Sequence, residues 1–346
     1  MIHLFYIYSG IVARMVPLII EHLNLKPEDV LVVTDRSQTA ASVASGLPTA
    51  EASFEPLLKR WRTIPYDWCS VITNSHRIEQ LTGGRKFIAY LPSASDPTCQ
   101  QILWHPLCRC YWLIEEGLGS YCQPGASPVH PEPFTRYQKF QLGLRIRGLG
   151  RISPTITDYP HWPSKYNGAF GSNASAFPDF PPQVINLDHP LYQAVDSMIT
   201  RLVIFDDFAN FNPTLQAIYL NVIRQVISSE HTPGDHWAYK LHPRCAAWPA
   251  LVAEAKRVFD EILPPGTPCD QLAPDTCAED IGLSPAVTTY GYMSSCLFYI
   301  HECGGKVASF KTILESREPT FHKFWLRFFP PVLETLVGDY RMLPLP

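Results

Sequence analysis

The chain has 346 residues, of which 46% are hydrophobic and 17% are charged, and its formal net charge is −4. This composition excludes a disordered chain, because there is enough apolar surface for one large domain or two ordinary ones. The small negative charge gives no reason to expect a nucleic-acid-binding protein. No stretch reaches the ~18 apolar residues of a membrane span. Arg14 interrupts the apolar opening segment, so we expect a strand and a helix there rather than a signal peptide.

The cysteines and prolines indicate the redox state of the protein and the amount of irregular structure. None of the ten cysteines forms a CxxC pair, so we expect reduced thiols in a cytoplasmic protein and no zinc site. Cys110 and Cys296 fall in apolar runs, where a free thiol behaves as a small hydrophobe. The 33 prolines are nearly twice the usual fraction of about 5%, which predicts long irregular segments.

Apolar segments with strand and helix patterns alternate along most of the chain. We predict a first series of strands over 2–8, 30–34, 70–73, 87–91 and 110–114, with a helix over 11–23. A second series comprises strands over 202–205, 237–241 and 287–290, with helices over 214–228 and 246–262. Between the two series, 124–190 is rich in proline and includes the Gly- and Asn-rich segment 166–173, so we expect an irregular excursion and a linker.

This alternation predicts the fold class. Strands alternating with helices are typical of parallel sheets with helical crossovers. We therefore expect an α/β protein with two Rossmann-like domains facing a central cleft, where ligands bind beyond the carboxyl ends of the strands. The predicted boundaries are 1–190 for an acceptor-side domain, 191–324 for a nucleotide-sugar-binding domain, and 325–346 for a tail that packs back on the N-terminal domain.

An acidic tripeptide, Glu115-Glu116-Gly117, follows the predicted strand 110–114. Adjacent side chains on a strand point to opposite faces, so at most one of these carboxylates faces a cleft. A partly buried carboxylate there can accept a proton from a hydroxyl group. For an isolated motif of this kind, a solvated strand end is the more common interpretation.

Two motifs of the second half suit a phosphate leaving group. In Lys240-Leu-His242-Pro243-Arg244, Lys240 and His242 alternate along the predicted strand, and Pro243 ends it. An imidazole in this position can donate a proton to a departing phosphate. Ser294-Ser295 precedes an apolar helical segment, where hydroxyls and backbone amides bind phosphate. The plainer interpretations are a structural histidine and a helix cap; His105-Pro106, which lacks flanking cations, is expected to be structural.

Three further groups of charged residues could contribute to a site. Glu279 could hold ribose hydroxyls, although a solvated loop acid is the more common role. Asp206-Asp207 ends a predicted strand, and we favour a structural or cleft-lining role over a metal site. The segment 136–151 carries five cations and no acid, which indicates either a solvated face or a patch for an anionic acceptor or membrane surface.

Together the motifs resemble those of bacterial GT-B sialyltransferases, namely the lipooligosaccharide sialyltransferase and polysialyltransferase families. Those families carry an acidic D/E-D/E-G motif, then K-x-H-P, then a serine pair, in the order found here. The resemblance implies that Glu116 is the general base, while Glu115 faces away. It also implies that His242 is the general acid or phosphate partner, that Lys240 and Pro243 belong to the donor site, that Ser294 and Ser295 hold the CMP phosphate, and that Glu279 binds the donor ribose.

The implied reaction is an inverting, metal-independent transfer of sialic acid from CMP-sialic acid to a hydroxyl of a glycan or glycolipid acceptor, without a cofactor. The implied setting is the cytoplasm, with peripheral contact at the inner membrane face as an option. Two alternatives remain open at this point. One is a GT-B transferase for another nucleotide sugar such as CMP-Kdo, and the other is a non-catalytic carbohydrate- or nucleotide-binding protein.

Overall fold

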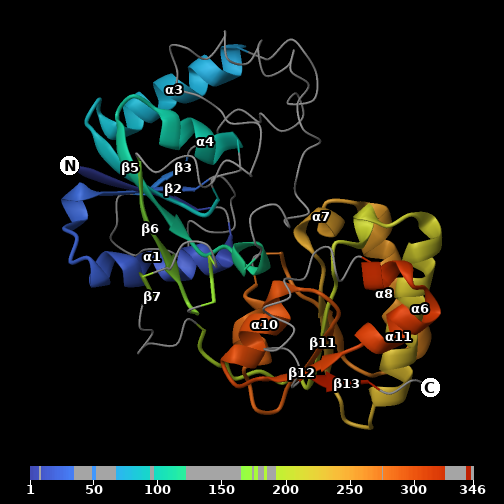
Figure 1. Cartoon of the computed structure of the whole chain (residues 1–346). Helices are drawn as coiled ribbons and strands as arrows, with labels where there is room; N and C mark the ends of the chain where they lie inside the picture. Colours follow the sequence, from blue (N-terminus) through green and yellow to red (C-terminus); the bar gives the residue numbers. More distant parts are fainter. Residues whose placement is uncertain are drawn as a thin grey trace. The chain divides into compact units, whose positions relative to one another are not determined.

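The computed structural model describes residues 1–7, 9–34, 49–51, 68–93, 97–121, 165–173, 175–177, 183–184, 192–274, 276–323 and 340–343. The chain divides into two compact units, Met1–Leu191 and Tyr192–Pro346. Figure 1 shows that each unit has its own sheet with its own helices. The basic segment 136–151 lies outside the described residues.

Unit 1 is built on a parallel sheet whose strand order is β3-β2-β1-β4-β5-β6-β7. Apolar residues dominate its central strands and are almost entirely buried, as expected when helices cover both faces of a sheet. Its strands are β1 (Ile2–Ile7), β2 (Val30–Thr34), β3 (Thr49–Glu51), β4 (Phe87–Leu91), β5 (Cys108–Ile114), β6 (Tyr166–Gly171) and β7 (Gln183–Val184). The described helices are α1 (Gly10–His22), α3 (Trp68–Thr82) and α4 (Pro97–Trp104), with 3-10 turns η1 (Pro27–Asp29) and η2 (Leu118–Tyr121).

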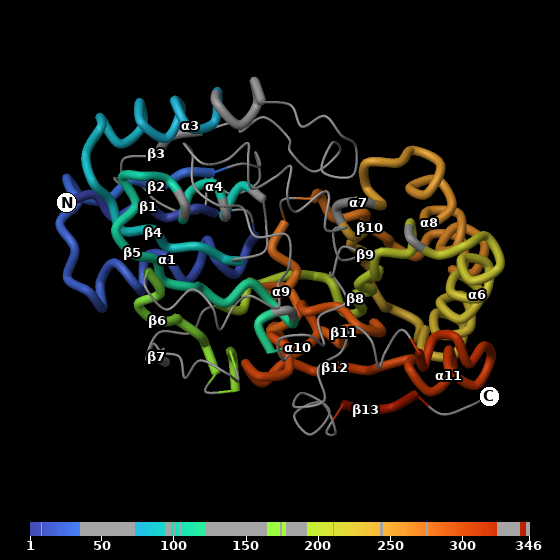
Figure 2. The backbone as a smooth tube through the Cα atoms, turned by 45° about the horizontal axis from the view of Figure 1, so that its top comes forward, coloured from blue at the N-terminus to red at the C-terminus, as the bar shows by residue number. Residues whose placement is uncertain are grey.

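Unit 2 has a second parallel sheet, with the strand order β10-β9-β8-β11-β12-β13. Its strands are β8 (Arg201–Ile204), β9 (Trp237–Lys240), β10 (Cys269–Gln271), β11 (Thr288–Gly291), β12 (Lys306–Ser309) and β13 (Arg341–Met342). Its helices are α6 (Pro213–Glu230), α7 (Pro243–Ala246), α8 (Pro249–Ile262), α9 (Ala278–Gly282), α10 (Ser295–Glu302) and α11 (Lys311–Arg317), with the turn η4 (Phe208–Asn210). Figures 1 and 2 show α6 and α8 side by side on one face of this sheet and α10 on the other.

Both strand orders follow the Rossmann pattern, in which the chain runs outward from the first strand and then restarts on its other side. The reversal lies between β1 and β4 in unit 1 and between β8 and β11 in unit 2. Ligands of such sheets bind beyond the carboxyl ends of the strands at this reversal. In unit 2 the segments that follow β8, β9, β10 and β11 are therefore the ones that can build a site.

Two sequence predictions about unit 1 were wrong. The predicted strand 70–73 lies inside α3, whose residues Asn74, Ile78 and Thr82 recur every fourth position and are all buried, so the helical period prevails over the β-branched composition. The segment 166–173 is not irregular, because most of it forms β6. Gly168 is needed there because a Cβ at this position would lie 2.3 Å from the Trp112 ring of β5.

One prediction about unit 2 also changes. The predicted helix 246–262 starts later, because Ala246 ends the separate helix α7 and Pro249 starts α8 after Trp248. The tail 325–346, which we expected to pack on the N-terminal domain, is described only at 340–343, where β13 pairs with β12 of unit 2. No helix in the described part of the chain is long and apolar enough to cross a membrane.

Candidate functional site

The acidic tripeptide lies directly beyond the carboxyl end of β5 in unit 1. Glu115 is fully buried, and its carboxylate accepts hydrogen bonds from the Tyr121 hydroxyl at 2.7 Å and from the Ser172 amide and hydroxyl at 2.5 and 2.8 Å. These bonds connect the end of β5 to η2 and to the end of β6. Glu116 is partly exposed, and its amide donates to the Ser120 hydroxyl at 3.0 Å. The two carboxylates therefore lie in different environments, one internal and one open to solvent.

Gly117 makes the turn behind these carboxylates possible. Its φ of +140° lies in a region that favours glycine, and η2 starts at the next residue. The turn brings Ser120 back to the Glu116 amide and Tyr121 back to the Glu115 carboxylate. The backbone around Glu116 is consequently held by hydrogen bonds on both sides.

His242 follows β9 in unit 2, one residue beyond the buried Leu241. Its ring is 41% exposed, and Nδ1 lies 3.8 Å from Oδ1 of Asp207, which follows β8. Its carbonyl accepts from the Ala246 amide at 3.0 Å as α7 begins at Pro243. Proline after the histidine thus starts a short helix, and the accessible imidazole lies beside a carboxylate between the end of β9 and this helix.

Ser294 and Ser295 form the start of α10. Ser294 is the N-cap residue, and its hydroxyl accepts from the Cys296 amide at 3.3 Å. Ser295 is the first residue of the helix. The plain interpretation as a helix cap is therefore correct for Ser294, and the positive end of the α10 dipole lies at this serine pair.

Asp206, at the end of β8, fixes the segment that leads to this serine pair. It is 6% exposed, and it accepts from the Met293 amide at 2.9 Å and from the Tyr219 hydroxyl at 2.9 Å. Burial is the largest influence and raises the pKa of Asp206 to about 6, although these hydrogen bonds oppose it. The Asp206–Met293 bond joins the ends of β8 and β11, the two strands at the reversal of the sheet.

Three of the residues singled out from the sequence, Lys240, Glu279 and Ser294, influence the pKa of the Cys296 thiol. Burial is the largest cause that raises the pKa of this thiol; the Glu279 carboxylate raises it further, while Lys240 and a hydrogen bond with Ser294 lower it. The Lys240 ammonium also donates to the Thr276 carbonyl beyond β10. Burial thus keeps the Cys296 thiol neutral, as expected for a cysteine in an apolar run, although Glu279 and Lys240 are near enough to affect its pKa.

The predicted pairing of Lys240 with His242 on one strand face is not observed. β9 ends at Lys240, which turns toward the segment after β10, whereas His242 approaches Asp207 after β8. Sequence reasoning did not single out Cys296 and Asp207 as site residues. Cys296 directly follows Ser295, and Asp207 lies just after a predicted strand, so their positions could have pointed to them.

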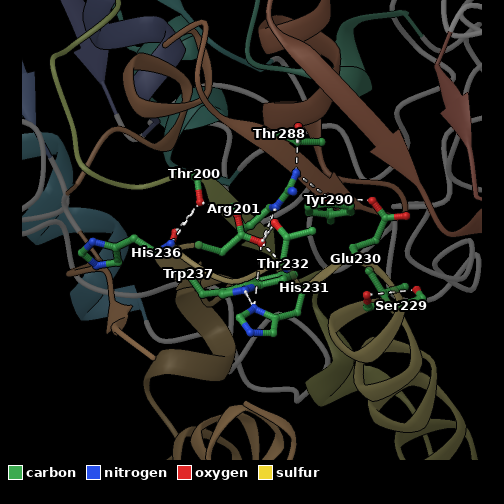
Figure 3. A network of polar contacts seen from close by, with 12 residues as sticks. Thr200, Arg201, Ser229, Glu230, His231, Thr232, His236, Trp237, Thr288 and Tyr290 are labelled. Carbon is green, nitrogen blue, oxygen red and sulfur yellow. Dashed lines mark hydrogen bonds and ion pairs between the residues drawn. The ribbon is translucent and has the colours of Figure 1, made fainter. Parts of the chain in front are cut away.

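A second polar network lies at the opposite, amino ends of the same strands (Figure 3). The Arg201 guanidinium donates to Asp235 at 3.1 Å, and Asp235 also accepts from Thr200 at 3.0 Å and from the Thr232 amide at 2.7 Å. Burial would raise the pKa of Asp235, but hydrogen bonds from Thr232, Arg201 and Thr200 outweigh it and lower the pKa. This network connects β8 to the turn before β9 and is structural.

Other predictions from the sequence concern residues away from the carboxyl edge of the unit 2 sheet. His105 is buried, as a structural histidine would be, and its ring nitrogen accepts from the Leu107 amide at 3.2 Å. Burial lowers its pKa. The cysteines whose side chains are described form no disulfide bond with one another. Within the described ranges, no three His, Cys, Asp or Glu side chains gather as metal ligands would.

No protein-family model and no curated protein matches the sequence. Among solved structures, the UDP-GlcNAc 2-epimerase of Methanocaldococcus jannaschii, in complex with UDP-GlcNAc and UDP, is similar with a TM-score of 0.53 and 11% identity, over 99% of this chain and 89% of that one. A putative UDP-N-acetylglucosamine 2-epimerase of Listeria monocytogenes reaches a TM-score of 0.49 and 9% identity, over 99% and 98% of the two chains. At these identities the likeness concerns the fold.

The fold class predicted from the sequence is confirmed. Two parallel sheets, each with the Rossmann strand order and each covered by helices, make this an α/β protein. The similarity to the archaeal structure extends over nearly the whole of both chains. The chain therefore has the two-domain GT-B fold found among nucleotide-sugar enzymes.

Proposed function

We propose that this protein is a metal-independent, inverting glycosyltransferase that moves sialic acid from CMP-sialic acid to a hydroxyl of a glycan or glycolipid acceptor in the cytoplasm. The observation that carries the proposal is that Lys240 at the end of β9, Glu279 in α9 and Ser294 at the start of α10 all lie at the carboxyl edge of the unit 2 sheet, where each influences the pKa of Cys296. These residues come from three segments of the chain, and each was singled out from the sequence as a donor-site residue.

The chemistry of this edge suits a nucleotide monophosphate. The Lys240 ammonium and the N-terminus of α10 offer positive charge and donors to a phosphate. Glu279 offers acceptors to ribose hydroxyls. In the proposal Ser294 and Ser295 hold the phosphate, and Pro243 sets the start of the helix behind His242.

The proposed step is a single displacement. Glu116 takes the proton of the acceptor hydroxyl, and the oxygen attacks the anomeric carbon as the bond from that carbon to the CMP phosphate oxygen breaks. His242 donates a proton or hydrogen bond to the departing phosphate, and Lys240 balances its charge. Exposure supports these assignments, because Glu116 and His242 are both accessible while Glu115 is fully buried.

The M. jannaschii enzyme of similar fold was solved with UDP-GlcNAc and UDP, so the donor base must be chosen on other grounds. A CMP-activated sugar is preferred here because the motif order Glu115-Glu116-Gly117, Lys240-Leu-His242-Pro243, Ser294-Ser295 resembles that of the sialyltransferases. CMP-Kdo and UDP sugars are the alternative donors within the same reaction class.

The test is donor turnover by the purified full-length chain with CMP-sialic acid, CMP-Kdo and UDP-GlcNAc, each with and without a glycan acceptor. We expect acceptor-dependent release of CMP from CMP-sialic acid. Glu116→Gln and His242→Ala should each slow it by at least about a hundredfold, the usual scale of general acid–base catalysis. His236→Ala is the matched control, because His236 also faces an aspartate, Asp270 at 2.7 Å, but lies at the amino edge.

Each outcome decides between the candidates. If the protein turned over UDP-GlcNAc but neither CMP sugar, the donor would be a UDP sugar and not a CMP sugar. Turnover that neither Glu116→Gln nor His242→Ala slows by about tenfold would refute the site. Nucleotide binding without turnover of any donor would favour a non-catalytic nucleotide- or carbohydrate-binding protein.

A further inference from the structure

One partly buried hydrogen bond crosses the point where the unit 2 sheet reverses its strand order. Asp206 lies two residues beyond the end of β8, and Met293 lies two residues beyond the end of β11. The carboxylate of Asp206 accepts from the Met293 amide at 2.9 Å. We propose that Asp206 is a positioning residue of the donor site, which holds the turn from Tyr292 to Ser294 in the orientation that grips the donor phosphate. This inference rests on the function proposed above.

The carboxylate is itself held firmly. The Tyr219 hydroxyl donates to Oδ2 of Asp206 at 2.9 Å and accepts from the Asp206 amide at 2.9 Å, while Oδ1 receives the Met293 amide. Tyr219 is fully buried in α6, and Asp206 is 6% exposed. Both carboxylate oxygens are therefore used within the protein, which makes Asp206 a fixed support rather than a group that touches substrate.

The turn that Asp206 holds is closely packed on its other side. A Cβ at Gly291 would come within 2.6 Å of the Leu297 side chain, so β11 and α10 meet with no room for a larger residue. The turn between them is thus fastened at Gly291 by packing and at Met293 by the carboxylate. Ser294 follows directly and caps α10.

A preorganised turn binds phosphate more tightly than a loose one, because the cost of ordering it is already met on folding. Loss of the Asp206 carboxylate would leave the Met293 amide without its buried acceptor, and the turn would reorganise to reach another one. The grip on the phosphate should weaken, while contacts to the nucleoside should change little. This difference separates positioning of the serine turn from a general loss of stability.

The experiment is calorimetric titration of the full-length protein with CMP and, separately, with cytidine. Asp206→Ala should weaken CMP binding about tenfold or more, as expected for losing a hydrogen bond to a charged group, and leave cytidine binding within about twofold. Asp206→Asn keeps one acceptor oxygen and should recover part of the loss. Tyr219→Phe leaves the carboxylate in place but removes the hydroxyl that holds it. This variant should therefore weaken CMP binding less than Asp206→Ala does, and it should also leave cytidine binding unchanged.

Asp235→Ala is the matched control, because it removes a buried carboxylate of similar exposure just before β9, at the amino edge of the same sheet. It should change neither titration in the folded fraction. Should Asp206→Ala fail to fold, Tyr219→Phe and Asp206→Asn carry the same comparison.

The outcomes separate the two proposals. If the wild type binds CMP and the Asp206 and Tyr219 variants bind it equally well, the positioning role is overturned and the proposed function stands. Equal weakening for CMP and cytidine would also overturn it, because the effect would not concern the phosphate. If the wild type binds no CMP, the proposed function fails, and the positioning role falls with it.

Discussion

The Tyr121 hydroxyl donates to Oε1 of Glu115 at 2.7 Å, while the other oxygen of that carboxylate receives the amide and hydroxyl of Ser172. Glu115 is thereby committed to holding η2 and the end of β6 against the end of β5. The neighbouring Glu116 keeps solvent access. One acidic motif therefore contains a structural carboxylate and a candidate base, and these two roles can be separated by experiment.

Glu115→Gln should lower the stability of the protein, whereas Glu116→Gln should lower its transferase activity. Glu115→Gln places an amide group opposite donors in a buried site, so we expect a loss of roughly 1–3 kcal/mol in the free energy of unfolding. Glu116→Gln should unfold like the wild type within about 0.5 kcal/mol but lose transferase activity. Urea unfolding and initial rates with saturating donor measure the two effects. Full activity in Glu116→Gln would remove this residue from the mechanism.

Ser294 should contribute both to stability and to phosphate binding. Ser294→Ala removes the cap of α10, which typically costs about 1 kcal/mol, and should also weaken CMP binding. Asn212→Ala is the control, because the Asn212 side chain caps α6 by accepting from the Leu215 amide at 3.0 Å. It should cost similar stability and leave CMP binding unchanged. If both variants bind CMP like the wild type, Ser294 is only a helix cap.

The pKa of Asp206 predicts a pH-dependent contribution to stability. Because burial raises this pKa from 3.8 to about 6, the protonated form is favoured in the folded state. The resulting stabilisation is complete below about pH 4 and is lost as the pH rises through about 6. The stability difference between the wild type and Asp206→Asn should therefore fall by about 2 kcal/mol from about pH 4.5 to pH 7. A difference that is flat over this range, measured by urea unfolding, would show that Asp206 titrates normally.

Gly168 is predicted to be indispensable to the unit 1 sheet. It has a φ of +152°, and a Cβ would overlap the Trp112 ring at 2.3 Å, so Gly168→Ala should cost about 3 kcal/mol or more or prevent folding. Gly10→Ala, at the start of α1, meets nothing within 4 Å and should change stability by less than about 1 kcal/mol. Thermal unfolding compares the two. Equal stability of both variants would mean that the Trp112 ring can move away at little cost.

The sequence predicted the α/β class and most strands because parallel strands buried on both faces are continuous apolar runs, as at 30–34 and 87–91. The prediction of an irregular segment at 166–173 was wrong, because Gly168 lets the Trp112 ring pack against the strand β6. The prediction of a strand at 70–73 was wrong, because its β-branched residues lie on the helix α3. Both outcomes depend on partners far away in the chain, which periodicity alone cannot reveal.

For the proposed donor site, the order of the motifs indicated which residues to propose, but not their contacts. The apolar run around Cys296 indicated a buried thiol, but it gave no sign that Glu279 and Lys240 would influence the pKa of that thiol. The role of Asp206 depends on a strand order in which β8 adjoins β11. That adjacency is a property of the sheet and has no local signal in the sequence.

The central claim is that CMP binds at the carboxyl edge of the unit 2 sheet. Hydrogen exchange of backbone amides, followed by mass spectrometry with and without CMP, tests it directly. We predict slower exchange at 291–297 and around His242, with the amino edge near Arg201 and Asp235 unchanged, and a smaller effect with UDP. No protection at the carboxyl edge, or protection there by UDP but not by CMP, would contradict this account.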